Sequence, residues 1–283
     1  MADIDNIAVP SLFDTIYGSF NGGGHTLSFN IPPSVSLTMS SPFGTLVPTN
    51  STKPILDSLK IKSNVKSTDA GFSNLAIENT DDVGTISNLV NMIDVQTDVW
   101  NKGIAGINSN NTEIKISNCI NHANIDGMIF IGGISAINDK EIIITNCINT
   151  GNITGITVVG GIFGAIANSS FVVSSCINTG KISGTSNIGG IIAYITFEKK
   201  TFDLENNSNY GKITINNGSI CGGIVGSLGT SYTPLSYHQN FSNCISTGSI
   251  EANNDSHCVL GAIYRSIFSI INCYWDKQMC PDD

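Results

Sequence analysis

The sequence predicts an all-β protein, a parallel β-helix solenoid of about eight coils with a period of about 28–30 residues. The first observation is a repeat: EIKISNCINHANIDG, EIIITNCINTGNITG and FVVSSCINTGKISG follow one another along the chain. Their cysteines, Cys119, Cys147 and Cys176, lie 28 and 29 residues apart. The second observation is a glycine pair that follows each copy at the same spacing. A fixed period of this size indicates a stack of repeated units. The pairs are Gly132-Gly133, Gly160-Gly161 and Gly189-Gly190.

Each repeat contains short apolar segments bounded by turn-forming residues. In the second copy these segments are Ile142–Asn146, Asn152–Ile156 and Val158–Phe163. Segments of this length between Asn, Gly, Ser and Thr are typical of strands, and no long 3.6-residue periodicity predicts a helix. A unit this short has no room for crossover helices. Each strand is therefore expected to pair in parallel with its equivalent one coil away, about 4.8 Å off.

The repeat extends over most of the chain, which we interpret as a single β-helix domain, residues 1–283. Residues 1–70 are expected to form degenerate N-terminal capping coils, residues 71–271 the regular repeats and residues 272–283 the C-terminal end, because terminal repeats tend to be atypical. The glycine spacing widens in the C-terminal half. This widening predicts protruding loops near Thr201–Asn206 and Thr230–Gln239.

Glycines and asparagines are expected at the corners of the coil. Glycine has no Cβ, so the pairs are expected to allow a positive φ and a close approach between layers. Asparagine tolerates the left-handed region, and its amide can bond to its equivalent one coil away. Strict alternation would turn Cys119 outward, whereas a bend at Asn118 would turn it inward. We favour inward, because the aligned residues are Leu89 and further cysteines. The two stacked sets are Asn118, Asn146, Asn243 and Asn272, and then Asn121, Asn149 and Asn178.

Five of the eight cysteines share one repeat position. We interpret them as a stack of reduced, buried thiols that act as small apolar side chains. Disulfides between adjacent coils are allowed by distance, but in-register positions point their Cβ atoms the same way, which is poor geometry. The sequence contains no CxxC pair, so a zinc site is not predicted. A further set of cysteines and one histidine is scattered along the chain without the regular spacing of metal ligands, so neither a metal site nor a cofactor is predicted. That set is Cys221, His257, Cys258, Cys273 and Cys280, of which Cys280 is expected to be exposed and reactive.

The sequence shows no motif of a catalytic site, because HExxH, GxSxG and P-loop patterns are absent. Glu113 and Glu141 occupy the same repeat position and would stack one strand spacing apart, near the carboxylate separation of retaining glycosidases. We interpret them as solvated surface carboxylates beside Lys115 and Lys140 rather than as an acid–base pair. The chain is therefore predicted not to be an enzyme, and no catalytic, cofactor-binding or metal-binding residue is assigned.

Charge and hydropathy restrict the partners. The formal net charge of −9 argues against nucleic acid and against anionic membrane surfaces. The longest weakly polar run, around Val158–Ala167, is too short for a transmembrane segment. Residues 1–11 have no basic start and no apolar core, so no signal peptide is predicted.

The pattern GGIxG followed by IxNCxNxGxIxG resembles the GLUG-type repeat of surface and secreted proteins, over most of residues 12–276. The opening Phe20–Leu27 and the closing Cys273–Asp276 are also similar to the ends of such repeat arrays. The resemblance implies a right-handed β-helix of the adhesin-like kind, which also occurs in the non-catalytic part of IgA1-type metallopeptidases. It further implies a location at the cell surface or outside the cell. A cytoplasmic location is the alternative that follows from the missing signal peptide.

We therefore expect a non-enzymatic binding or structural repeat module, with adhesion or ligand display at a cell surface implied by the resemblance. A protein or a glycan is the expected partner, since a rigid rod offers an extended face for repeated weak contacts. Two alternatives stay open at this stage: a carbohydrate-active enzyme of the polysaccharide lyase or glycosidase type, and an intracellular scaffold.

Overall fold

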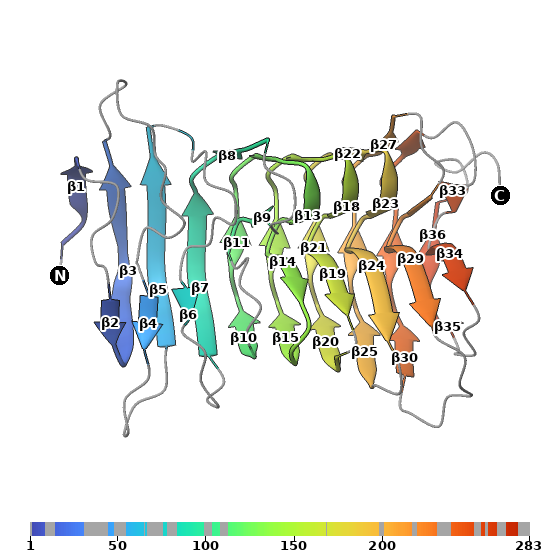
Figure 1. Cartoon of the computed structure of the whole chain (residues 1–283), viewed down its shortest axis with the longest axis horizontal. Helices are drawn as coiled ribbons and strands as arrows, with labels where there is room; N and C mark the ends of the chain where they lie inside the picture. Colours follow the sequence, from blue (N-terminus) through green and yellow to red (C-terminus); the bar gives the residue numbers. More distant parts are fainter. Residues whose placement is uncertain are drawn as a thin grey trace.

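In the computed structural model the chain forms an elongated stack of β-strands (Figure 1). All the secondary structure of the described residues is strand, so the predicted all-β parallel β-helix is confirmed. Within the described part of the chain, no helix has the length and apolarity needed to cross a membrane. The structure describes residues 2–8, 15–30, 45–47, 55–64, 66, 76–77, 84–98, 104–107, 113–167, 169–197, 201–216, 220–230, 239–251, 256–257, 260–264 and 270–276.

One parallel sheet of 16 strands runs along the whole stack. Its strands pair in register with their equivalents, so that Ile114 lies beside Ile142 and Ile142 beside Phe171. The 28- and 29-residue periods of the sequence are therefore the lengths of single coils. The strands are β1 (Ile4–Ile7), β3 (Ser19–Phe29), β5 (Ile55–Ser63), β7 (Gly84–Met92), β10 (Ile114–Ser117), β11 (Ile120–Asn121), β15 (Ile142–Thr145), β16 (Ile148–Asn149), β20 (Phe171–Ser174), β21 (Ile177–Asn178), β25 (Phe202–Glu205), β26 (Ser208–Asn209), β30 (Gln239–Ser242), β31 (Ile245–Ser246), β35 (Ile270–Ile271) and β36 (Tyr274–Trp275).

Three further parallel sheets complete the wall of the solenoid, and a small one lies at the N-terminal end. The second sheet contains β8 (Val95–Gln96), β12 (Ile125–Asp126), β17 (Ile153–Thr154), β22 (Ile182–Gly184), β27 (Ile213–Ile215) and β32 (Ile250–Glu251). The third contains β9 (Ile104–Ala105), β13 (Ile129–Gly132), β18 (Thr157–Gly160), β23 (Ser186–Gly189), β28 (Cys221–Gly222) and β33 (Ser256–His257). The fourth contains β14 (Ser135–Asn138), β19 (Phe163–Ala167), β24 (Ile192–Phe197), β29 (Val225–Thr230) and β34 (Leu260–Tyr264), and the small sheet contains β2 (Thr15–Tyr17), β4 (Thr45–Val47) and β6 (Ala76–Ile77).

The number of complete coils is lower than predicted. Among the described residues, only five coils supply strands to all four large sheets, because the fourth sheet has five strands. The expectation of about eight coils also counts rungs whose described residues supply strands to only some of the large sheets. At the N-terminal end, β1, β3 and β5 extend the first sheet, while β2, β4 and β6 pair only with one another. At the C-terminal end, β35 and β36 add to the first sheet alone.

Two details of the predicted segments are wrong. The sequence predicts three strands per unit, whereas the second copy forms five, β15 to β19, because corners divide the apolar segments. The loop expected near Thr201–Asn206 is a strand instead, since β25 pairs in register with β20. The longer coil lies further on, where 37 residues separate Asn209 from Ser246. Most of the loop expected at Thr230–Gln239 lies outside the described residues.

A left-handed corner sets the register of each coil and confirms the inward orientation of the cysteines. Asn118 and Asn146 both have φ of 54°, a conformation that asparagine tolerates better than most residues. The bend interrupts the alternation of the strand, so the following Cys119 and Cys147 point into the core, with 0% exposure. The same conformation recurs along the stack at Asn88, Ser175, Asn206, Asn243 and Asn272.

A buried ladder of asparagine amides runs along the interior, as predicted for the second aligned set. The side-chain nitrogen of Asn121 donates to Oδ1 of Asn149 at 2.8 Å, and that of Asn149 donates to Oδ1 of Asn178 at 2.8 Å. Each of these amides also donates to the carbonyl two residues further on, such as that of Gly151 at 2.9 Å. The ladder thus satisfies polar groups that would otherwise be buried without partners. Its members are Asn91, Asn121, Asn149, Asn178 and Asn209.

The glycine pairs make room for this ladder. A Cβ on Gly161 would overlap the carbonyl oxygen of Gly190 and lie 2.6 Å from Cγ of Asn178. A Cβ on Gly133 would meet Cγ of Asn149 at 2.5 Å. The predicted close approach is therefore confirmed. The predicted positive φ is wrong, because among the described glycines only Gly18, Gly23 and Gly24 have one.

Candidate binding face

The outer surface of the first sheet carries regular columns of uncharged side chains. Half-buried isoleucines project outward from β11, β16 and β21, with exposed hydroxyl or imidazole groups on one side and hydroxyls and amides on the other. We call this surface the uncharged face. Its side chains are Ile120, Ile148 and Ile177; His122, Thr150, Thr179 and Tyr210; Ser117, Thr145 and Ser174; and Asn118, Asn146 and Ser175.

Neighbouring coils hold these columns in register. Ile120 pairs with Ile148, and Ile148 pairs with Ile177, across parallel strands. Beside them, Nδ1 of His122 lies 2.7 Å from Oγ1 of Thr150. Because parallel strands lie about 4.8 Å apart, the exposed groups repeat at that interval along the axis of the stack. The result is a pre-ordered surface that loses little side-chain entropy when a partner binds.

A second polar ladder fixes the margin of this face. Oδ1 of Asp94 accepts the backbone N–H of Asn124 at 2.8 Å, and Oδ1 of Asn124 accepts that of Asn152 at 3.0 Å. The amide oxygen of Asn152 then accepts the N–H of Lys181 at 3.1 Å. These bonds tie each turn to the next, so the margin is as regular as the strands beside it.

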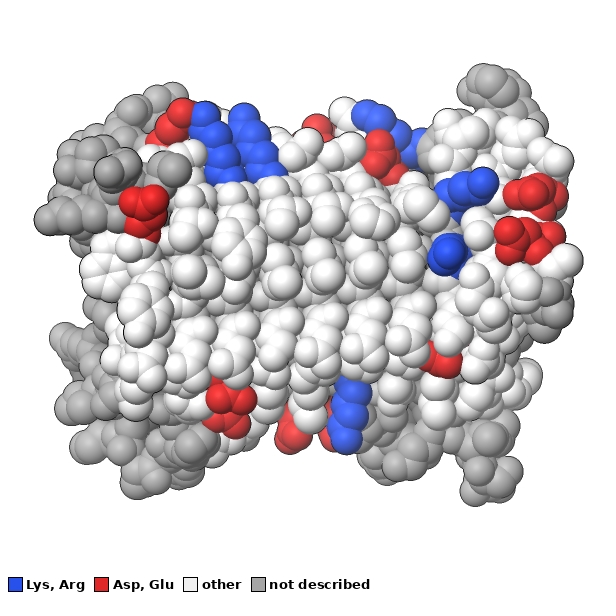
Figure 2. All heavy atoms as spheres, turned by 180° about the vertical axis from the view of Figure 1, so that it is seen from behind, with Lys and Arg blue, Asp and Glu red and all other residues white. Residues whose placement is uncertain are grey.

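Charged side chains lie around this face rather than on it. Figure 2 shows a broad surface of uncharged residues with the acidic and basic side chains gathered at its margins. Two aromatic rings extend the face towards the C-terminal end: Tyr210 is 49% exposed and Tyr274 is 63% exposed. An exposed Tyr combines an apolar ring with a hydroxyl, which suits contact with partners that are partly apolar and partly polar.

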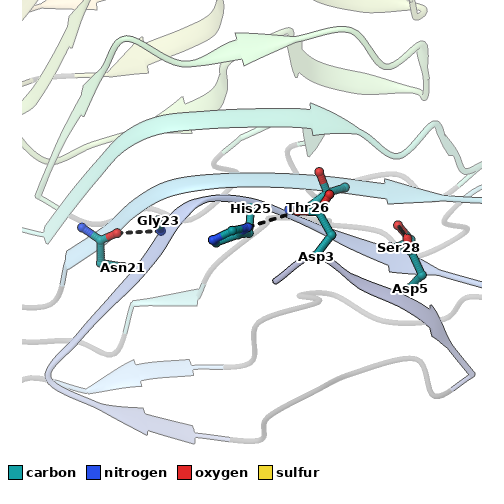
Figure 3. A network of polar contacts seen from close by, with 7 residues as sticks. All are labelled: Asp3, Asp5, Asn21, Gly23, His25, Thr26 and Ser28. Carbon is teal, nitrogen blue, oxygen red and sulfur yellow. Dashed lines mark hydrogen bonds and ion pairs between the residues drawn. The ribbon is translucent and has the colours of Figure 1, made fainter. Parts of the chain in front are cut away.

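A network of polar contacts lies at the N-terminal end of the stack (Figure 3). Oδ1 of Asp3 accepts the backbone N–H of Thr26 at 2.9 Å and lies 3.3 Å from Nδ1 of His25. The hydrogen bond from the Thr26 backbone, together with His25, lowers the pKa of the exposed Asp3 carboxyl. In the same strands, Asp5 accepts a hydrogen bond from Ser28. The contacts join β1 to β3.

Next to this network lies an open cleft of about 500 Å³. Oδ1 of Asn6 accepts a bond from the amide of Asn30 at 3.2 Å within it. The cleft combines amides, two serine hydroxyls, one carboxylate and one ammonium group. Its lining residues are Asp5, Asn6, Ser28, Phe29, Asn30, Lys62, Ser63 and Asn64.

Asp57 accepts hydrogen bonds from several neighbouring side chains. Burial alone would raise its pKa, but hydrogen bonds donated by Ser87, Asn88 and Ser58 outweigh burial and lower the pKa from its ordinary value of 3.8. Ser87 donates at 2.6 Å and Asn88 at 2.8 Å to Oδ1, while Asn21 donates at 3.0 Å to Oδ2. A carboxylate held in this way joins three successive coils, and its role is structural.

The two glutamates considered for catalysis lie on adjacent coils as predicted. Glu113 and Glu141 immediately precede the paired strands β10 and β15, and both are exposed. Neither belongs to an ion pair among the described residues. Asp126 pairs with Thr154, so its column, unlike that of the glutamates, has no second carboxylate in the next coil. Neither glutamate lines the N-terminal cleft.

The two described cysteines of the scattered set lie on different sheets. Cys221 is buried in β28, whereas Cys273 lies on the first sheet. His257 lies beside Gly222 in the third sheet, and Cys258 and Cys280 lie outside the described residues. The described part of the chain has no group of three metal-ligating side chains.

The buried cysteine column behaves as expected for apolar thiols. Sγ of Cys147 donates to the carbonyl of Thr145 at 3.3 Å, and burial raises the pKa of the Cys119 and Cys176 thiols. One coil replaces the cysteine: Asn207 donates to the Val173 carbonyl at 2.8 Å and accepts the Cys176 N–H at 3.0 Å.

Sequence reasoning did not single out the outward isoleucine column or the exposed Tyr210 and Tyr274. The signal that could have found them is the bend itself. Once the residue after each corner asparagine points inward, the next residue, such as Ile148, must point outward. A column of outward Ile, Ile and Ile on an uncharged surface then stands out.

Comparison with known proteins gives a relationship of fold. No family model matches the chain, and no curated protein matches it. Among solved structures, the chain is similar to a protein from Bacteroides ovatus described as a "putative immunoglobulin A1 protease". The two share 18% sequence identity with a TM-score of 0.51, over 89% of this chain and 84% of the other. At this identity the similarity supports the solenoid fold, and one solenoid fold serves many functions.

Proposed function

We propose that this protein is a non-enzymatic binding module that attaches to uncharged glycan chains through the uncharged face. The observation that carries the proposal is the array of outward isoleucines flanked by hydroxyls, amides and exposed tyrosines. A glycan presents apolar C–H faces beside hydroxyl groups. The uncharged face likewise places apolar isoleucines next to hydroxyls and amides that can form hydrogen bonds. The pairing of parallel strands holds these side chains in place, so binding requires little further ordering of the protein.

Location at a cell surface or outside the cell is part of the same proposal. It is supported by the resemblance of the repeats to GLUG-type proteins, and the solenoid similarity to the Bacteroides ovatus protein is consistent with it. The proposal assigns no catalytic role to Glu113 and Glu141, which are exposed side chains.

Two threonines of the same coil provide a matched test. Thr150 is exposed on the uncharged face and contacts His122, whereas Thr154 is exposed on β17 of the second sheet and contacts Ser183. The full chain would be titrated against neutral polysaccharides such as β-glucan, mannan and xylan, with polygalacturonate as the charged comparison. Thr150→Lys is expected to weaken binding about tenfold, which corresponds to about 1.4 kcal/mol.

Thr154→Lys adds the same charge and is expected to leave the affinity unchanged, because it lies on another sheet. Equal affinities of the two variants would refute the uncharged face as the site. Failure of every neutral polysaccharide to bind would refute the glycan as the partner.

A further inference from the structure

The last described coil leaves its inward side chains uncovered. Of the described strands, none pairs with the outer edge of β35 or β36. Ile270 and Trp275 occupy positions that point into the core in earlier coils, yet they are 45% and 48% exposed. Cys273 lies between them on the same segment and is the only cysteine of the described residues that is not buried.

Cys273 stacks directly on a second thiol. The strands on either side of the corner pair Ile245 with Tyr274, which places Cys244 one coil below Cys273 at the same position. Cys244 is completely buried, and its Sγ lies 3.4 Å from the Ser242 carbonyl oxygen. The sulfur of Cys273 is a second acceptor within reach of its single S–H. One thiol is therefore open to reagents, and the other is enclosed beneath it.

We propose that Cys273 is a modification site that captures small disulfides by thiol–disulfide exchange, with Cys244 as the positioning residue. In this step the Cys273 thiolate attacks one sulfur of the disulfide R–S–S–R. A Cys273–S–S–R bond forms, the original S–S bond breaks, and the other half leaves as a thiolate that takes a proton from water. No additional oxidant is required.

The chemistry of the pair supports this step. The hydrogen bond from the Cys244 thiol stabilises the charged form and lowers the pKa of Cys273 to about 7. A thiol with a pKa near the ambient pH combines a sufficient thiolate fraction with good nucleophilicity. The same contact and burial raise the pKa of Cys244, so the lower thiol stays protonated and remains a donor. The exposed Ile270 and Trp275 leave an apolar surface beside the sulfur.

The test uses oxidised glutathione as the small disulfide and the full chain as the protein. Intact mass and peptide mapping after incubation at pH 7 are expected to show one adduct on Cys273 and none on Cys147 or Cys244. The rate of addition is expected to be half-maximal near pH 7. No adduct on Cys273, or a disulfide-linked dimer in its place, would overturn the proposal.

Two substitutions separate positioning from a structural role. Cys244→Ala removes the donor, so the midpoint of the pH–rate profile is expected to rise towards 9.0, the ordinary thiol value. Cys244→Ser restores a donor and is expected to return the midpoint towards pH 7. Identical profiles for the Ala and Ser variants would overturn the role of Cys244. Should Cys244→Ala fail to fold, the wild-type profile decides alone, because a midpoint near 9.0 contradicts the proposal.

Discussion

Gly161→Ala tests whether the interior ladder needs the glycine pairs. The added methyl group would overlap the carbonyl oxygen of Gly190, and it would lie 2.6 Å and 2.9 Å from Cγ and Cβ of Asn178. Asn178 is fully buried and bonded to Asn149 and Asn209 on either side, each at 2.8 Å, so it cannot yield without breaking the ladder. Overpacking against backbone typically costs 1–3 kcal/mol, and we expect about 3 kcal/mol here.

Gly229→Ala is the matched control, because its nearest atoms would lie 3.7 Å or more from the new Cβ. This substitution is expected to be neutral or to stabilise by about 0.5 kcal/mol, through the lower entropy of the unfolded chain. Chemical unfolding by urea, followed by circular dichroism, measures both changes. If Gly161→Ala unfolds at the same urea concentration as the wild type, the steric account of the glycine pairs is wrong.

Three further predictions concern the ladder, one carboxylate and catalysis. Asn149→Ala removes two donated bonds and one accepted bond within the core, so unfolding should become easier by about 3 kcal/mol; a loss below about 1 kcal/mol in a urea titration would count against the ladder. The pKa of Asp57 is lower in the folded state, so its contribution to the free energy of unfolding is present above pH 3.8 and is lost as the pH falls through the lower folded value. Asp57→Asn should therefore reduce the loss of stability at acid pH, and an unchanged acid limb of the stability profile would contradict this. The wild type, Glu113→Gln and Glu141→Gln should all show polysaccharide turnover no higher than a buffer blank. Turnover by the wild type that either substitution abolishes would identify an enzyme.

The period and the residue types at the corners were sufficient to predict the stack. The spacing of Cys119 and Cys147 equals one coil, and the left-handed tolerance of Asn118 explains why the cysteine turns inward. The number of complete coils could not be predicted, since the N-terminal rungs repeat the apolar pattern of the first sheet while their described residues supply no strands to the other three large sheets.

The glycine pairs show that the local sequence alone does not reveal why a position must be glycine. A positive φ is the usual reason for a corner glycine. Position 161 instead requires glycine because a Cβ there would collide with Asn178 in the neighbouring coil. That contact joins residues far apart in sequence and depends on how the coils stack. The uncharged face was missed for a related reason, since the outward direction of Ile148 follows only once the bend at Asn146 is known. The partial exposure of Cys273 likewise depends on its place in the last described coil.

The dependence of affinity on glycan length is the most direct test of the proposed function. Exposed groups of the uncharged face repeat about every 4.8 Å along the stack, so each added sugar should reach a new set of contacts. Calorimetric titration with oligosaccharides of increasing length, prepared from whichever neutral polysaccharide binds, should show affinity rising over several sugar units before it levels off. Affinity that is already maximal for a disaccharide would contradict the account, because it would indicate a compact pocket such as the N-terminal cleft instead of an extended face.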